Sequence, residues 1–422
     1  MKTILKIGFI VLLLLNSLYA ESVDEKRDRA HSVRKVVDSI GKLETKDISI
    51  VDSFKHMFID GKLSGQIKSI YGTYNQKERG VEDSYATALG GILKYELAEF
   101  NGFNAGAAVY TSHDINFATG AGTKHNNELS SSSGEYTQMA EVYINYNYKD
   151  LNIRVGRQSL ETPLADSDDI RMIQNSFNAY ILTYNYAGID FMIGHLKSWQ
   201  GYDADLDTPW STTGKDGTNL IGASYSDGLE FNLWYYNITQ NMNALYLDTG
   251  FEYAFSKEYQ FHTMVQYLHE SELNSSGFAA DIYGALLEIV AYDIGFNIAF
   301  NKSNKQKGKQ TFSGNGGGTM FTSMDTSIID DLANDRDVLA IVAGIVYSIN
   351  DFNLLYAYGD FNGDENSAGQ KEHKVEHDFS IEYNVNDEFL VSAVYATVED
   401  KQHKLKTQYD WNRVQVMVNY NF

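Results

Sequence analysis

Polar and apolar side chains alternate along much of the chain, and most charged side chains in these segments fall on the polar positions. A period of two is the spacing of a β-strand that has one polar and one apolar face. Acids and bases that face one another across a narrow wet gap produce a transverse field, which orients ions and dipolar solutes. The charged face carries Lys68, Lys94, Glu96, Glu141, Arg154, Asp190, Glu230, Glu252, His262, Glu288, Glu376, Asp378, Glu382 and Arg413.

The apolar face of these segments carries aromatic residues near the strand ends, as interfacial girdles do in membrane barrels. The chain has 30 Tyr and 22 Phe but 2 Pro, a composition that favours strands. A Lys or Arg on a lipid-facing position costs roughly 2–4 kcal/mol at the bilayer midplane. So many charges on one parity therefore predict a wet interior, enclosed by about eighteen strands that form a transmembrane antiparallel β-barrel.

The connections between the predicted strands alternate in length. Short turns such as Asn101-Gly102, Ala187-Gly188 and Asn350-Asp351 alternate with longer connections, of which 302–337 is the longest. Outer-membrane barrels have short periplasmic turns and long extracellular loops. A soluble two-sheet sandwich would show the same strand pattern, but its connections would not be sorted by length.

The two ends of the chain agree with a barrel that is exported. Residues 1–20 have the charged start, short apolar run and terminal Ala20 of a signal peptide. Residues 21–60 are predicted to form a periplasmic, partly helical segment, because apolar residues recur at helical spacing between Ala30 and Leu43. The barrel would occupy 61–422. Its closing strand ends on Tyr420 and Phe422, which resemble the terminal signal that the barrel assembly machinery recognises in this class.

Composition excludes other classes of function. The net charge of −22 argues against a nucleic-acid partner. The chain has no cysteine, which excludes disulfides and thiolate metal sites. Asp330, Asp331, Asp335 and Asp337 could hold Ca²⁺, but solvated loop acids are the commoner explanation, and no cofactor or resident metal is expected. His113, His125 and His195 form no recognisable hydrolase pattern, so no catalytic residue and no enzyme activity is predicted.

The segment Gln158–Phe177 carries the most specific motif. The run Arg154-x-Gly156-x-Gln158, Thr162-Pro163, Asp169-x-Arg171 and Ser176-Phe177 resembles the outer membrane porin D (OprD-like) family. The resemblance implies that this third extracellular loop folds inward and forms the constriction of a porin. On that basis Pro163 would turn the loop into the barrel, and Arg154 would line the wall below it. The implied constriction residues are Glu161, Pro163, Asp166, Asp168, Asp169 and Arg171. An alternative is that Asp169 and Arg171 only pin the loop.

The family's ladder of basic wall residues is weak here, since Lys68, Lys94, Arg154 and Arg413 face about ten acids. This favours cations or zwitterions, such as amino acids and small peptides, over organic acids. The leading hypothesis is a passive porin for small hydrophilic solutes, surrounded by outer-membrane lipid and lipopolysaccharide. An adhesin or structural barrel and an outer-membrane hydrolase are the alternatives. The sequence leaves open the substrate, the gating and whether the chain is a monomer or a homotrimer.

Overall fold

The structure is a computed structural model that describes residues 50–76, 83–117, 124–168, 170–208, 210–316, 318–402 and 410–422. The predicted signal peptide, the helical stripe Ala30–Leu43 and Asp169 lie outside these residues. A helix, α3 (Ile50–Ile59), precedes the first strand. Its end contacts the first short turn of the barrel, where the amide of Ala98 donates to the carbonyl of Met57 at 2.9 Å. No helix in the described part of the chain is long and apolar enough to cross a membrane.

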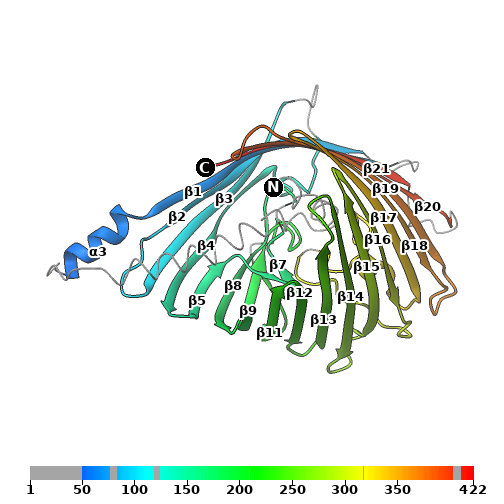
Figure 1. Ribbon diagram of the computed structural model, residues 1–422, viewed down its shortest axis with the longest axis horizontal. Helices are drawn as coiled ribbons and strands as arrows, with labels where there is room; N and C mark the ends of the chain where they lie inside the picture. The colour runs from blue at the N-terminus through cyan, green and yellow to red at the C-terminus, as the bar shows by residue number, and fades with distance from the viewer. Residues whose placement is uncertain are drawn as a thin grey trace.

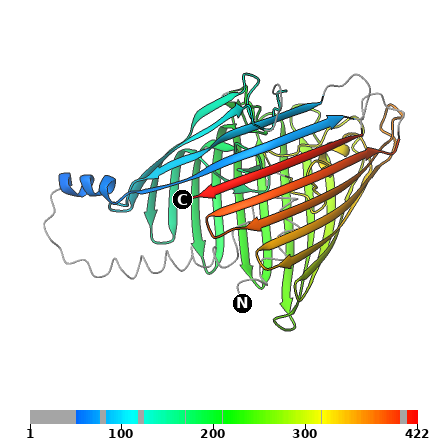
Figure 2. The ribbon, with the colours of Figure 1, turned by 90° about the horizontal axis from the view of Figure 1, so that it is seen from above.

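Eighteen antiparallel strands form a closed barrel (Figures 1 and 2), which confirms the predicted fold and strand number. The strands are β1 (Lys62–Gln76), β2 (Ser84–Glu96), β3 (Phe103–Ile115), β4 (Glu135–Tyr148), β5 (Leu151–Gln158), β8 (Ser176–Tyr186), β9 (Ile189–Gln200), β11 (Thr218–Asp227), β12 (Leu229–Ile238), β13 (Met242–Ala254), β14 (Tyr259–Glu272), β15 (Ala280–Ala291), β16 (Ile294–Ser303), β17 (Val338–Ile349), β18 (Phe352–Gly363), β19 (Glu372–Asn384), β20 (Phe389–Asp400) and β21 (Trp411–Asn421).

The barrel closes where β21 pairs with β1, from Gln66↔Asn421 to Gln76↔Trp411. Figure 2 shows these two strands, the first and the last of the chain, side by side. The seam extends to the terminal residue, because the backbone groups of Phe422 and Gly65 exchange two hydrogen bonds of 3.0 Å. The prediction that the closing strand pairs with the first strand is therefore confirmed.

The short turns have the backbone conformation that tight hairpins need. Asn101 and Gly102 have φ of 51° and 84°, and Ala187 and Gly188 have φ of 53° and 84°. Two successive positive φ angles define a type I′ turn, whose twist matches that of the flanking strands. Asn and Gly reach this region most easily, which explains the Asn101-Gly102 signal in the sequence.

The two faces of the strands follow the predicted alternation. The outer face of the barrel exposes apolar side chains around its circumference, including Ile67, Ile144, Ile193, Phe251 and Phe296. On the closing strand, Val416 and Val418 are exposed on the outer face, whereas Arg413 and Gln415 are buried inside. Two β-bulges interrupt the alternation, one in β4 opposite Ala108/Val109 and one in β9 opposite Asn178/Ala179.

Four extracellular connections are central to the interior of the barrel. They are L2 (116–134), L3 (159–175), L4 (201–217) and L7 (304–337). L3 contains the two-residue strands β6 (Glu161–Thr162) and β7 (Ala165–Asp166), L4 contains β10 (Ser211–Thr212), and L7 contains the short helix α4 (Ile329–Leu332).

Candidate functional site

L3 enters the barrel as a small hairpin. Thr162 pairs with Ala165, so Pro163 and Leu164 form the two-residue turn between β6 and β7. Pro presets the φ angle for such a position. Leu164 is buried, and its amide donates to the hydroxyl of Tyr236 on the wall strand β12 at 3.3 Å. The turn therefore lies against the inner face of β12.

L7 binds the same hairpin from the other side. Ala165 forms a parallel bridge with Asn315, whose amide donates to the carbonyl of Leu164 at 3.0 Å. The hydroxyl of Thr319 donates to the carbonyl of Pro163. The contacts of Asn315 are between main chains, and the Thr319 side chain adds a further bond, so together they fix L3 and L7 to each other. The participation of L7 was not predicted from the sequence.

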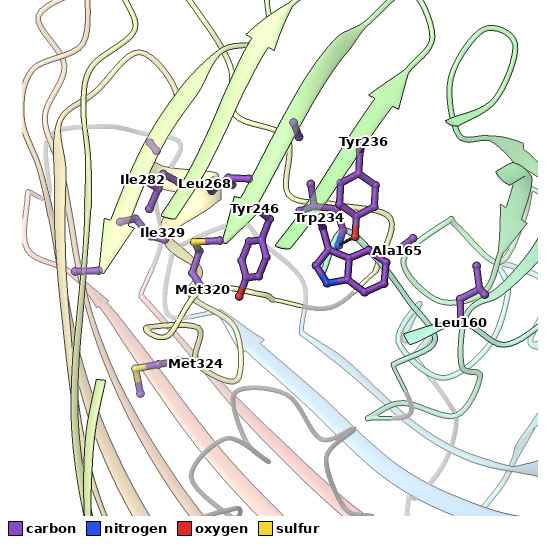
Figure 3. Packing of buried hydrophobic residues seen from close by; sticks show 14 of the residues in the cluster. Leu160, Ala165, Trp234, Tyr236, Tyr246, Leu268, Ile282, Met320, Met324 and Ile329 are labelled. Carbon is purple, nitrogen blue, oxygen red and sulfur yellow. Dashed lines mark hydrogen bonds between the residues drawn. The ribbon is translucent and has the colours of Figure 1, made fainter. Parts of the chain in front are cut away.

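A buried apolar cluster joins the two loops to the wall. Figure 3 shows Leu160 and Ala165 from L3 and Met320, Met324 and Ile329 from L7 with wall residues of β12 to β15. The labelled wall residues are Trp234, Tyr236, Tyr246, Leu268 and Ile282. This part of the interior is a packed core. The predicted wet interior does not extend to this part of the barrel, because loop side chains replace water against the wall.

The second half of L3 packs on the opposite wall. Met172 and Ile173 belong to a separate buried cluster with Ile70 of β1 and Tyr110 of β3. Leu129 of L2 and Leu206 of L4 join this cluster. Since Leu164 lies against β12 and Ile173 lies against β1 to β4, L3 crosses the lumen from one wall to the other.

Four charged residues meet between these two apolar clusters, and we call them the central charge cluster: Glu128, Arg171, Asp325 and Arg413. Nε of Arg413 is 2.9 Å from Glu128, and its Nη1 donates to Asp325. Nε of Arg171 is 3.9 Å from Glu128. These residues come from L2, L3, L7 and the wall strand β21, and the Arg171 guanidinium lies 5.5 Å from the ring centroid of Tyr202 in L4. Four loops thus converge on one wall strand.

The cluster is almost fully removed from water. The side chain of Arg413 is 1% exposed and that of Asp325 is 6% exposed. Burial and the nearby Arg413 would lower the pKa of Arg171, but Glu128 and Asp325 outweigh them and raise it. Burial would raise the pKa of Asp325, but Arg413 and Arg171 hold it below its ordinary value. The charged forms of Arg171 and Asp325 are therefore both favoured by their surroundings.

Wall groups hold both loops next to this cluster. Nζ of Lys68 donates to the carbonyl of Arg171 at 2.8 Å. The amides of Thr326 and Ser327 in L7 donate to Glu376 at 3.0 and 2.8 Å. The amide of Asp325 donates to Asp378 at 3.2 Å. These wall residues lie beneath the loops, which explains why they are buried although the sequence placed them on a wet wall.

The other predicted loop acids have separate environments. Glu161 is exposed, and Oδ1 of Asp168 accepts from the amide of Ile170 at 3.0 Å. Burial, with added repulsion from Asp168 and Glu161, raises the pKa of Asp166 well above its ordinary value. Asp166 thus favours its neutral form, whereas Arg171 is held by carboxylates. The ion pair of Arg171 with Glu128 and the bond from Lys68 to its carbonyl support the alternative that Arg171 pins L3. Its described partners are Glu128 and the carbonyl of Asp325, and the predicted pairing with Asp169 lies outside the described residues.

Further down the wall, the charged residues are divided by sector. The four predicted wall cations lie on β21, β1, β2 and β5, around the seam. Lys94 is 3.0 Å from Glu141, and Arg154 donates to Asn145 at 3.3 Å with its guanidinium 4.5 Å from the centroid of the Tyr143 ring. Among the described residues Arg154 forms no ion pair with a carboxylate.

The opposite sector, β12 to β15, carries three of the predicted wall acids, Glu230, Glu252 and Glu288, and no predicted wall lysine or arginine. His262 on β14 lies between Glu288 at 2.8 Å and Glu230 at 3.2 Å. Glu252 lies opposite His262 across β13 and β14 and is exposed. Asp190 lies on β9, between the two sectors, and Glu376, Asp378 and Glu382 lie on β19, two strands from the closing strand. Glu96 and Glu141 lie in the basic sector, where Lys94 contacts both of them.

The weaker candidates do not converge on one another. Asp331 accepts from Ser313, Asp335 accepts from the amides of Gly308 and Ser367, and Asp337 accepts from the amide of Lys305. Within the described ranges, no group of three or more His, Cys, Asp or Glu side chains is placed to hold a metal ion. His113 and His195 contact Thr111 and Asn219, respectively.

The closed barrel with inward loops is the architecture of the outer-membrane porins. No protein-family model matches the chain, and no curated protein sequence matches it either. Several solved structures match the chain. Pseudomonas aeruginosa OpdK, crystallised with vanillate, has a TM-score of 0.72 at 15% identity over 87% of this chain and 99% of that chain. Acinetobacter baumannii OccAB3 has a TM-score of 0.73 at 12% identity over 86% and 99%.

A BenF-like porin from Pseudomonas fluorescens Pf-5 has a TM-score of 0.72 at 13% identity, over 87% of this chain and 100% of that chain. The TM-scores show a common fold, and at identities of 12–15% the likeness shows the fold alone. The fold that the OprD-like resemblance implied is therefore confirmed.

Proposed function

We propose that the protein is an outer-membrane porin, a passive channel for small hydrophilic solutes, in which L3 and L7 together form the constriction. The observation that carries the proposal is the closed barrel whose outer face is apolar and whose inner face is charged. Such a barrel satisfies its backbone groups within the sheet and presents only apolar side chains to lipid. The solved porins of the same fold support this function.

The division of the wall into two sectors suggests the class of solute. Lys94 and Arg154 lie on one side of the lumen, and Glu230 and Glu252 lie on the other. A field across the lumen turns a dipolar solute so that its carboxylate faces the cations and its ammonium faces the acids. We therefore propose that small zwitterions and cations pass better than organic anions. OpdK was solved with vanillate, and its likeness to this chain is one of fold.

Single-channel recording in a planar bilayer tests this function. The wild-type protein should show stepwise conductance, and the reversal potential in a salt gradient should indicate a preference for cations. Arg154→Gln should increase that preference, because it removes a cation that has no carboxylate partner among the described residues. Glu252→Gln should decrease it and serves as the matched opposite variant. A protein that inserts into the bilayer without conductance would refute the porin function.

The remaining expectations accompany the proposal. Localisation in the outer membrane, export through residues 1–20 and a periplasmic segment at 21–60 are parts of the same proposal. The relevant support is that α3 lies at the end of the barrel where the first short turn connects β2 to β3. We also propose that Tyr420 and Phe422, which complete the seam strand, present the signal for the assembly machinery.

A further inference from the structure

An arginine lies on the outer face of the barrel, where the strand pattern calls for an apolar residue. Arg157 on β5 pairs with Val142 on β4, which is 47% exposed on the outer face. Its Nη1 donates to the carbonyl of Met139, next to the β-bulge in β4, at 3.0 Å. Arg157 is one residue from the extracellular end of β5, so its charge is at the membrane boundary rather than the midplane.

A tryptophan and a lysine accompany this arginine. The Arg157 guanidinium lies 4.7 Å from the ring centroid of Trp210 in L4. Lys197 is the extra residue of the bulge in β9 and is exposed. Arg157 pairs with Asn178, and Asn178 pairs with Ser198, so Arg157 and Ser198 are two strand spacings, or roughly 10 Å, apart.

No described carboxylate pairs with either of these two cations. None of the ion pairs in the described part of the chain includes Arg157 or Lys197. Nothing in the barrel ladder requires a positive charge at either position. Since the chain as a whole has a net charge of −22, two adjacent uncompensated cations on this face are a local reversal of sign. They attract an anion from outside the chain.

The surface directly below the cations is apolar. Val155 precedes Arg157 on the same face of β5 and is 41% exposed, Tyr180 on β8 is 55% exposed, and Ile193 on β9 is 54% exposed. Tyr180 pairs with Val155, which makes this surface continuous across the strands. A ligand that fits both the two cations and the apolar surface below them has an anionic head at the membrane boundary and hydrocarbon chains below it.

We propose that Arg157, Lys197 and Trp210 form a binding site for the phosphorylated sugar headgroup of the outer-leaflet lipopolysaccharide. The guanidinium and ammonium contact phosphate oxygens, Trp210 holds the arginine in place through its ring, and the acyl chains cover Val155, Tyr180 and Ile193. The site rests on the proposed function, which places this end of the barrel in the outer leaflet.

Lipid binding to the purified barrel in detergent tests the site, with native mass spectrometry and diphosphorylated lipid A as the probe. One surface cation contributes about a fivefold change in affinity for an anionic lipid, so Arg157→Gln with Lys197→Gln should weaken binding about thirtyfold. Lys302→Gln is the matched control. Lys302 lies near the extracellular end of β16 and pairs with the exposed Tyr283 and Leu339, but it has no second cation beside it. The Lys302→Gln variant should bind diphosphorylated lipid A as tightly as the wild-type protein does.

Fully dephosphorylated lipid A should bind the wild-type protein about as weakly as the double variant binds the diphosphorylated lipid. The site is refuted if the double variant binds within twofold of the wild type, if Lys302→Gln weakens binding equally, or if removal of the phosphates has no effect. Conductance recorded on the same preparations separates this result from the porin proposal. Wild-type protein that binds lipid A selectively but does not conduct would refute the channel and retain the site.

Discussion

Replacement of Arg413 by glutamine should release L7 from the wall while the barrel stays folded. The substitution removes the guanidinium that contacts both Glu128 and Asp325 and leaves these buried carboxylates with only Arg171 as a cation. Removal of one partner of a buried ion pair costs about 3–5 kcal/mol. The backbone ladder from Ala396↔Arg413 to Phe389↔Tyr420 does not depend on the side chain. The loss of the ion pairs should therefore destabilise the packing of the loops and leave the barrel folded.

The magnitude predicts a large shift in loop population. Each 1.4 kcal/mol is a factor of ten, so the released form of L7 should become roughly two to three orders of magnitude more populated. Hydrogen exchange of the amides at 324–327 should accelerate by a similar factor, because Thr326 and Ser327 lose the position from which they donate to Glu376. Single-channel recordings should show more frequent transitions between conductance levels.

A second substitution distinguishes this mechanism from general damage. Arg413→Gln combined with Asp325→Asn removes the cation together with one of its two acids, so exchange at 324–327 should slow again relative to Arg413→Gln alone. Lys302→Gln on the outer face controls for the loss of a positive charge. The reasoning is refuted if Arg413→Gln leaves both the exchange at 324–327 and the channel transitions at wild-type levels.

Three further outcomes are expected. Burial, and then Asp331, raise the pKa of Asp330 to about 8. The folded protein therefore favours the neutral carboxyl. The contribution of Asp330 to the stability of the fold is full below about pH 4 and falls as the pH rises to 8. Asp330→Asn should therefore slow hydrogen exchange in α4 at pH 8 and leave it unchanged at pH 4. Arg413 and Arg171 hold the pKa of Asp325 low against the effect of burial. The contribution of Asp325 to holding L7 on the wall is therefore complete above about pH 4 and is lost at lower pH. Conductance transitions that did not increase on acidification below pH 4 would contradict this. Leu164→Ala should cost about 2–5 kcal/mol, because Leu164 is 2% exposed, and limited proteolysis of L3 measures the effect against Leu339→Ala on the lipid-facing surface.

The barrel could be predicted from the sequence because its rules are local. Every strand such as Val338–Ile349 carries its own alternation, and each turn such as Asn101-Gly102 carries its own signal. Parity then assigned Arg413 to the inner face and Val416 to the outer face without knowledge of any partner strand. The seam between β1 and β21 followed from the closure of an even number of strands.

The interior of the barrel could not be predicted in the same way. Glu128, Arg171 and Asp325 come from three loops without regular secondary structure around them, so no periodicity relates them. Only the wall residue Arg413 and the motif residue Arg171 were identified. The signal for L7 was present in its apolar residues, since Met320, Met324, Ile329 and Leu332 lie in a mainly polar connection and all are buried. Apolar side chains in an extracellular loop of a barrel predict packing inside the lumen, because outside they would face water.

The position of the central charge cluster separates two tasks within one lumen. Arg171 and Arg413 form ion pairs with carboxylates of L2 and L7, so they hold in place the loops that would narrow the proposed channel. Arg154 has no carboxylate partner within the described residues, and Glu252 is exposed across the lumen. In the proposed channel, a solute that passes the constriction would meet charges on opposite sectors of the wall, the cation Arg154 on β5 and the acid Glu252 on β13. Substitutions in the cluster should change gating more than selectivity, and substitutions at Arg154 or Glu252 should do the reverse.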